Sequence, residues 1–135
     1  MRTVWTMGFV AAAALSFCFP DFIVFRFTQA VIWSIALVGL VILHIQLSRG
    51  TTEYHFGVFA SLALVMVYLD WRPILLAAGL FALHHVVFDR LMAAGLGLYC
   101  LNEPDFGRIL LHALYVVVQT ALELMLVRGM AQAAS

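Results

Sequence analysis

The stretch TTEYHFGVFASLALVMVYLDW, residues 51–71, is almost wholly apolar, yet polar side chains stand at both of its ends. Glu53 and His55 open the stretch, and Tyr68, Asp70 and Trp71 close it. A membrane-spanning helix needs about 20 mostly apolar residues and rarely carries ionisable groups within that length. The stretch therefore predicts a membrane helix whose polar entrance needs a functional explanation.

The composition of the whole chain supports a membrane protein. Of its 135 residues, 65% are hydrophobic and only 10% are charged, whereas soluble domains average roughly 45–50% apolar and about 25% charged residues. Seven cations, all arginine, balance seven acids, so the charge pattern indicates no nucleic-acid partner. No glycine-rich phosphate loop and no serine paired with an obvious base are present, and we expect no enzymatic activity.

Apolar runs predict an all-α integral membrane bundle of about five transmembrane helices in one domain, residues 1–135. The expected spans cover residues 4–19, 22–46, 53–69, 73–91 and 106–127. The first has only 16 residues, and the alternative is an interfacial helix that leaves four spans. Because the connecting loops are short, neighbouring helices should be antiparallel.

Five histidines share one half of this predicted bundle. A helix rises about 1.5 Å per residue, and counting from the span ends places all five near the membrane face that holds residues 49 and 95. Ionisable groups inside membranes usually face the bundle interior and mark functional sites. The histidines, carried by four different helices, are His44, His55, His84, His85 and His112.

Several imidazoles at one depth indicate a cofactor site, for which three explanations are open. Our leading prediction is haem b, held by an axial pair of histidines, with His55 and one member of the His84–His85 pair as the best candidates. His112 and His44 are the remaining candidates for the haem. Adjacent helical residues point about 100° apart, so His84 and His85 cannot both face one iron from the same side.

The second explanation is a copper or zinc ion, because imidazole suits both metals and a carboxylate can join it. The predicted ligands of such an ion are His55, His84, His85, His112 and Glu53. The third explanation is proton transfer through a His/Glu chain. We favour it less because histidine does not recur across the full depth of the bundle.

Two further features concern the opposite half of the bundle and the cysteines. The spacing of polar residues in the last span predicts one inward stripe, formed by His112, Tyr115, Gln119 and Glu123. Near the opposite face we expect an ion pair between Arg26 and an acid, either Asp70 or Glu123. Cys18 and Cys100 should lie too far apart for a disulfide, and the arginines divide too evenly between the two faces to orient the protein.

Residues 42–89, ILHIQLSRGTTEYHFGVFASLALVMVYLDWRPILLAAGLFALHHVVFD, and 111–124, LHALYVVVQTALEL, carry a fairly specific set of motifs. They resemble the membrane-embedded input region of certain bacterial histidine kinases, diguanylate cyclases and chemoreceptors. In that family a helix ends in histidine, followed by an acid–x–His–Phe–His–x–Phe entrance, a Tyr–x–Asp–Trp corner, a His–His pair and a last span opening with His–Ala. The matching positions here are His44, Glu53, His55, Phe56, Tyr68, Asp70, Trp71, His84, His85, His112 and Ala113.

One departure from the family pattern lies in the entrance, where Gly57 stands in place of the second histidine. We expect this glycine to leave room for something flat or bulky, which favours haem over a compact histidine cluster. The match spans roughly residues 40–127 and includes the first predicted span only as a generic hydrophobic helix.

The resemblance implies a sensor-type domain in the bacterial inner membrane, with the histidine layer towards the periplasm. Such a domain would relay the redox or ligand state of its haem through the last span to a cytoplasmic output domain missing from this chain, and would act as a homodimer. The alternatives are a copper or zinc sensor, or a cytochrome b-like electron-transfer subunit.

Overall fold

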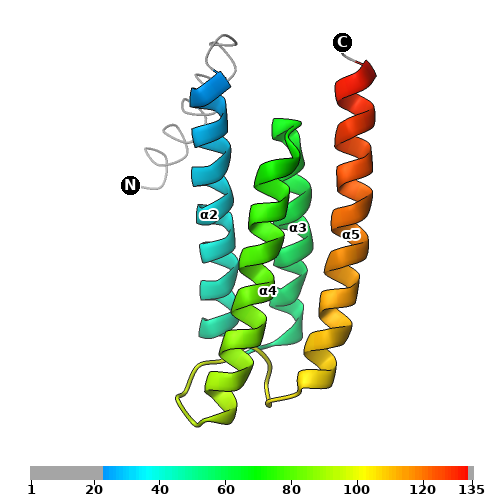
Figure 1. Ribbon diagram of the computed structural model, residues 1–135. Coiled ribbons are helices and arrows are strands. Elements are labelled where there is room, and N and C mark those ends of the chain that lie inside the picture. Colours follow the sequence, from blue (N-terminus) through cyan, green and yellow to red (C-terminus); the bar gives the residue numbers. More distant parts are fainter. Residues whose placement is uncertain (1–22, 134–135) are drawn as a thin grey trace.

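The chain folds into a bundle of α-helices, described here for residues 23–133 of a computed structural model. Four α-helices occur within that range, and no strand does. They are α2 (Ile23–Leu47), α3 (Phe56–Val65), α4 (Trp71–Ala93) and α5 (Phe106–Ala133), with the 3₁₀ turns η1 (Thr52–His55) and η2 (Met66–Tyr68) at the two ends of α3 (Figure 1). The prediction of an all-α chain is confirmed for these residues.

Three of the helices are long and apolar enough to cross a membrane, namely α2, α4 and α5. The predicted span 53–69 is helical over residues 52–68, but only its middle, the 10 residues of α3, is α-helical, and both of its ends are 3₁₀ turns. The chain leaves it at Leu69, whose φ is 54°, and α4 starts afresh where the Asp70 carboxylate accepts the Arg72 backbone N–H. The predicted span 4–19 lies outside the described residues, so the count of five is not confirmed.

The core of the bundle lies between α2, α3 and α4. Ile45, Leu62 and Ile74, one from each helix, are fully buried within one apolar cluster. Large apolar side chains also cover the outside, including Phe56 and Leu83. An apolar exterior of this extent is what lipid, and not water, would solvate.

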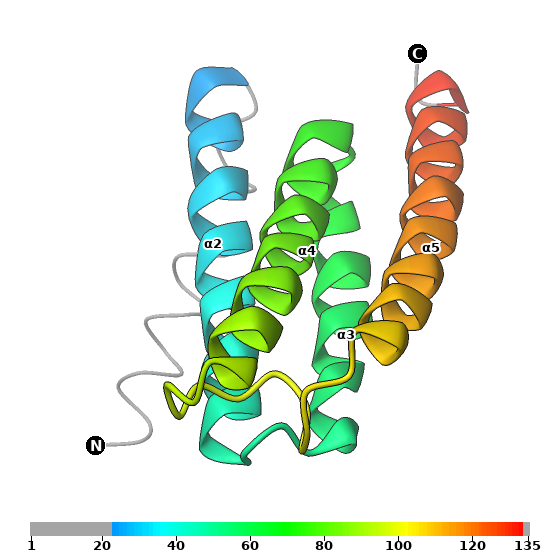
Figure 2. The same ribbon diagram turned by 60° about the horizontal axis from the view of Figure 1, so that its bottom comes forward.

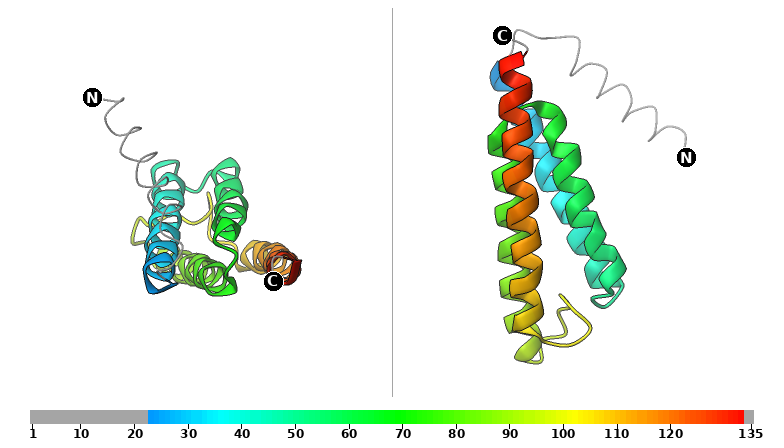
Figure 3. Two further views of the ribbon diagram at one scale, coloured as in Figure 1. Left: turned by 90° about the horizontal axis from the view of Figure 1, so that it is seen from above. Right: turned by 90° about the vertical axis from the view of Figure 1, so that its right-hand side faces the viewer.

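Helix α5 stands at the edge of the bundle. It packs mainly against α4 and to a smaller extent against α3 (Figures 1 and 3). The loop of residues 94–105 runs across the end of the bundle from α4 to α5 (Figures 1 and 2). This loop is therefore close to the end where α2 finishes and α3 begins.

Two expectations about the polar stripe and the far face differ from the structure. Tyr115 is exposed, so the inward face of α5 lacks it, although Gln119 does donate to Glu123 and to the backbone carbonyl of Phe59 on α3. Within residues 23–133 the ion pairs are Arg90–Asp89 and Arg108–Asp105. Arg26 forms none there: it shares a depression with Asp70 without pairing to it.

Candidate metal centre

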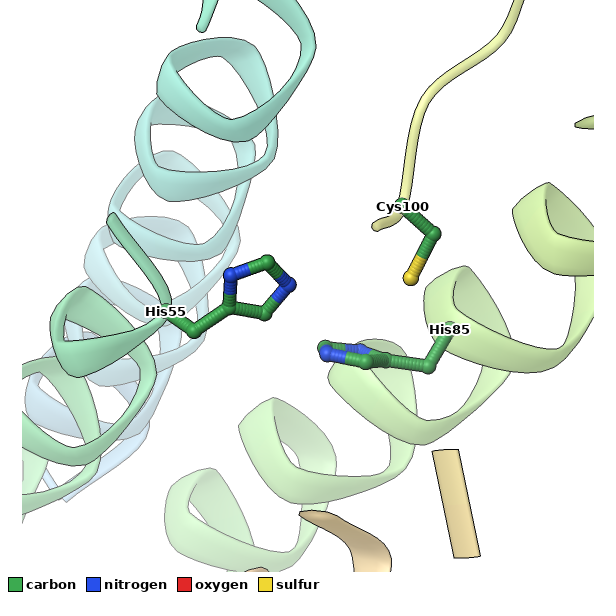
Figure 4. A group of neighbouring side chains, drawn as sticks. All are labelled: His55, His85 and Cys100. Carbon is green, nitrogen blue, oxygen red and sulfur yellow. The ribbon is translucent and has the colours of Figure 1, made fainter. Parts of the chain in front are cut away.

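Three side chains with metal-binding atoms meet at the end of the bundle where the loop crosses. His55, His85 and Cys100 each offer one ligand atom, and these atoms all lie within 4.8 Å of one another. Figure 4 shows the two imidazoles and the thiol pointing towards a common centre. All three residues are buried, so the group can hold a metal ion away from solvent.

Each of these residues comes from a different part of the fold. His55 is the last residue of η1, His85 lies in the second half of α4, and Cys100 belongs to the loop that precedes α5. The rings of His55 and His85 are 5.4 Å apart between centroids and meet edge to face. The group therefore exists only when the tertiary fold is complete.

Hydrogen bonds to the backbone set the orientation of both imidazoles. Nδ1 of His55 donates to the Thr51 carbonyl at 3.2 Å, and Nδ1 of His85 donates to the Phe81 carbonyl at 2.8 Å. A carbonyl can only accept, so Nδ1 carries the hydrogen and Nε2 is left with a free lone pair. Histidines that bind metals usually donate their other ring N–H in this way. Nε2 of His55 is buried and has no hydrogen-bond partner among the described residues.

The third donor is an uncharged thiol in the metal-free protein. Burial raises the pKa of Cys100 to about 12, and the nearby carboxylate of Asp89 adds to the effect. A bound cation would displace the proton, because thiolate is the ligating form. Two imidazoles with one thiolate suit copper and zinc better than the hard cations calcium and magnesium.

The loop that carries Cys100 is tied to two helices by buried or half-buried side chains. The amide of Gln46 at the end of α2 accepts the Tyr99 N–H at 2.9 Å and donates to the Gly97 carbonyl at 3.3 Å. The fully buried Asp89 on α4 accepts the Asp105 N–H at 3.1 Å through one oxygen, while Arg90 binds the other. Both ends of the loop segment around Cys100 are thus held by side chains outside the loop.

The remaining predicted ligands occupy different places around this group. His112 on α5 is half-buried and beside it, with its ring 5.4 Å from that of His55. His84 is buried against Phe88, with the two ring centroids 4.3 Å apart, and neither ring nitrogen of His84 has a hydrogen-bond partner among the described residues. His44 and Glu53 are exposed, with His44 against Tyr54. The structure thus brings His55 and His85 together, places His112 beside them, and puts neither His84, His44 nor Glu53 in the three-residue group.

Cys100 is the residue that sequence reasoning missed as a ligand. The chain shows no metal-binding cysteine spacing, so the only signal was the predicted position of Cys100 in a loop at the same membrane face as the histidines. That signal was used only to exclude a disulfide with Cys18, which lies outside the described residues.

The expectation about Gly57 is wrong. A Cβ at this position would lie 3.0 Å from Cγ2 and 3.2 Å from Cγ1 of Val41. The missing side chain therefore permits close packing of α3 on α2 and leaves no open space at this position. Gly57 therefore does not favour a flat cofactor over a metal ion.

Comparison with known proteins gives no functional guide for this chain: no family model, no curated protein and no solved structure matches it. The class of protein defined by the fold and the site is an all-helical chain with membrane-length apolar helices and a buried His/Cys group that can hold a metal ion.

Proposed function

We propose that this chain is a membrane-embedded sensory input module that binds one copper or zinc ion through His55, His85 and Cys100. The observation that carries the proposal is the convergence of three buried ligand atoms within 4.8 Å from three separate segments. Unpaired polar atoms in a membrane interior are costly, and a cation at this point would give the buried Nε2 of His55 the partner that it lacks among the described residues.

The sensory part of the proposal rests on the resemblance of residues 40–127 to bacterial input regions. In such a module the ion either is the stimulus or changes its binding in response to the stimulus. Helix α5 leads towards a cytoplasmic output domain. The module works as a homodimer in the bacterial inner membrane. The three membrane-length helices are consistent with this location. A fusion of residues 1–135 to a known output enzyme, assayed with and without the ion, tests the signalling step.

Haem b stays a prediction for the same histidines, and one observation bears on it. An apolar groove of about 540 Å³ runs between α4 and α5, with His85 and His112 on its lining. A flat apolar group in this groove would lie beside two imidazoles. Against haem, the ring centroids of His55 and His85 are 5.4 Å apart, about 1 Å closer than two imidazoles on opposite sides of one metal, with metal–nitrogen bonds of about 2.0–2.1 Å, would lie.

The test is to purify the whole chain in detergent and measure its metal content together with its visible spectrum, oxidised and reduced. We expect about one copper or zinc ion per chain, and loss of that ion in His55→Ala, His85→Ala and Cys100→Ser. His44→Ala is the matched control, because His44 is a predicted ligand that lies exposed outside the group. A Soret band with a sharp reduced α-band and no stoichiometric ion would refute the ion and establish haem.

A further inference from the structure

His112 stands next to the proposed metal site without being part of it. Its ring centroid is 5.4 Å from that of His55 and 6.3 Å from that of His85. Its Nδ1 donates to the Arg108 carbonyl at 2.9 Å, so its Nε2 has a free lone pair, as in His55 and His85. His112 is thus oriented like a ligand, but only the other three residues have their ligand atoms within 4.8 Å of one another.

The ring distances show how far His112 is from ligation. Two imidazoles bound through Nε2 to one tetrahedral ion, with metal–nitrogen bonds of about 2.0–2.1 Å, have ring centroids about 5 Å apart. The distances from His55 to His85 and from His55 to His112 are both 5.4 Å, close to that value. The distance from His85 to His112, 6.3 Å, is about 1 Å too long for shared ligation.

The distance that is too long for shared ligation separates His85 on α4 from His112 on α5. The backbone bond of Nδ1 holds each ring to its own helix, so closing the gap requires one helix to approach the other. The apolar groove of about 540 Å³ between α4 and α5 has both histidines on its lining. Small residues line it on both sides, among them Gly79, Ala82 and Ala113, and a Cβ at Gly79 would meet nothing within 4 Å.

Helix α5 is also the least constrained long helix of the bundle. Only four of its 28 residues are buried, and its first turn follows the loop that carries Cys100. A helix with few buried contacts is the element most easily displaced. Shifts of about 1–2 Å are the usual scale of helix movements in switching proteins.

We propose that His112 is the fourth ligand of the ion, and that ion binding draws the start of α5 towards α4. This inference rests on the proposed metal site. Together with His55, His85 and Cys100, His112 completes the four donors that zinc takes in closed sites. The ion favours the closed arrangement because it gains a ligand there, which is the differential affinity that a switch needs.

The test uses zinc(II) added to the metal-free whole chain in detergent, with two readouts. X-ray absorption at the zinc edge should report three nitrogen donors and one sulfur donor. Hydrogen exchange of the amides in residues 106–112 should slow on zinc addition, by about 10-fold or more, because this segment is held only when His112 ligates. His44→Ala should behave like the wild type in both measurements.

His112→Ala should still bind zinc through the other three residues, but about 10-fold or more weakly, since even the loss of an outer-shell partner costs 10–100-fold. Its zinc should have two nitrogen donors from histidine, and the amides of residues 106–112 should exchange at the metal-free rate. His112→Gln, which keeps the size of the side chain and a donor for the Arg108 carbonyl, should show the same loss with the fold intact.

Two results would overturn the inference alone: wild-type zinc bound with no change in the exchange of residues 106–112, or wild-type affinity and donor count in both His112 variants. A wild-type chain that binds no zinc and no copper would overturn the proposed function as well. The metal content of the wild type therefore separates failure of the site from failure of the switch.

Discussion

Gly50 and Leu101 lie backbone against backbone: a Cβ added to Gly50 would collide with the carbonyl carbon and oxygen of Leu101. Gly50 also has a φ of 79°, a conformation that other residues adopt only with strain. This contact joins the turn after α2 to the loop residue that follows Cys100. The position of one proposed ligand therefore depends on a glycine in a distant turn.

We expect Gly50→Ala to lower both the stability of the protein and its affinity for the ion, because neither backbone segment can yield without moving Cys100. Gly95→Ala is the matched control: its φ is 81°, yet a Cβ there would meet nothing within 4 Å. The control should cost only the strain of a left-handed residue, about 1–2 kcal/mol, and should keep full metal affinity. Thermal unfolding and zinc titration in detergent measure the two effects, and equal loss of affinity in both variants would contradict the role of the close contact.

Adjacent histidines on α4 should respond in opposite ways to substitution. His85→Leu removes a proposed ligand and should abolish stoichiometric metal binding. His84→Leu replaces a buried imidazole with no hydrogen-bond partner among the described residues, and removing an unpaired buried polar group is neutral or stabilising. We therefore expect His84→Leu to bind the ion normally and to unfold at the same or a higher temperature. Loss of the ion in His84→Leu would mean that His84 is a ligand after all.

Binding of the ion should release a proton from Cys100. Burial, with the Asp89 carboxylate, raises the pKa of this thiol from its ordinary 9.0 to about 12, so at pH 8 the metal-free protein holds the proton and thiolate ligation expels it. A pH indicator in weakly buffered detergent solution should register about one proton per ion at pH 8 in the wild type and none in Cys100→Ser. No release in the wild type would exclude thiolate ligation.

The raised pKa of Cys100 also affects the stability of the metal-free protein at high pH. Below pH 9 the thiol is protonated in both the folded and the unfolded chain, and its contribution to stability is fully present. Between about pH 9 and 12 only the unfolded chain loses the proton, so the stability of the metal-free protein should fall across that range. The decline should be smaller in Cys100→Ser, as measured by thermal unfolding at a series of pH values.

Asp89 should be a positioning residue for the loop of residues 94–105. Asp89→Ala leaves the Asp105 N–H without its buried acceptor, which costs about 1–3 kcal/mol, and it frees the loop that carries Cys100. Asp89→Asn keeps an oxygen that can accept this N–H, so we expect it to restore most of the stability and metal affinity lost in the alanine variant. Unfolding and zinc titration of the two variants check this expectation, and an asparagine variant as weak as alanine would show that the charge beside Arg90 is what matters.

The sequence alone determined the class of the protein and the approximate course of its helices. Apolar runs of membrane length predicted α2 and α4 to within two residues at each end, and α5 except for its last six residues. The cost of unsatisfied backbone groups in lipid leaves helix as the available state for such runs. The same counting placed five histidines in one half of the bundle, because the rise per residue of a helix is constant.

The tertiary structure decided which of these residues meet. The rotation of α4 about its axis turns His85 towards His55 on another segment, whereas His84 packs against Phe88 of its own helix. A hydrophobic pattern that is apolar on most sides could not fix that rotation. Cys100 reaches the site because Gln46 and Asp89 hold the loop from two other helices, contacts separated from Cys100 in sequence by 54 and 11 positions, respectively. Packing between helices likewise decides that the Gly57 position on α3 faces Val41 on α2. Periodicity fixes depth along a helix, whereas the direction of a side chain and the path of a loop follow from contacts between segments far apart in the chain.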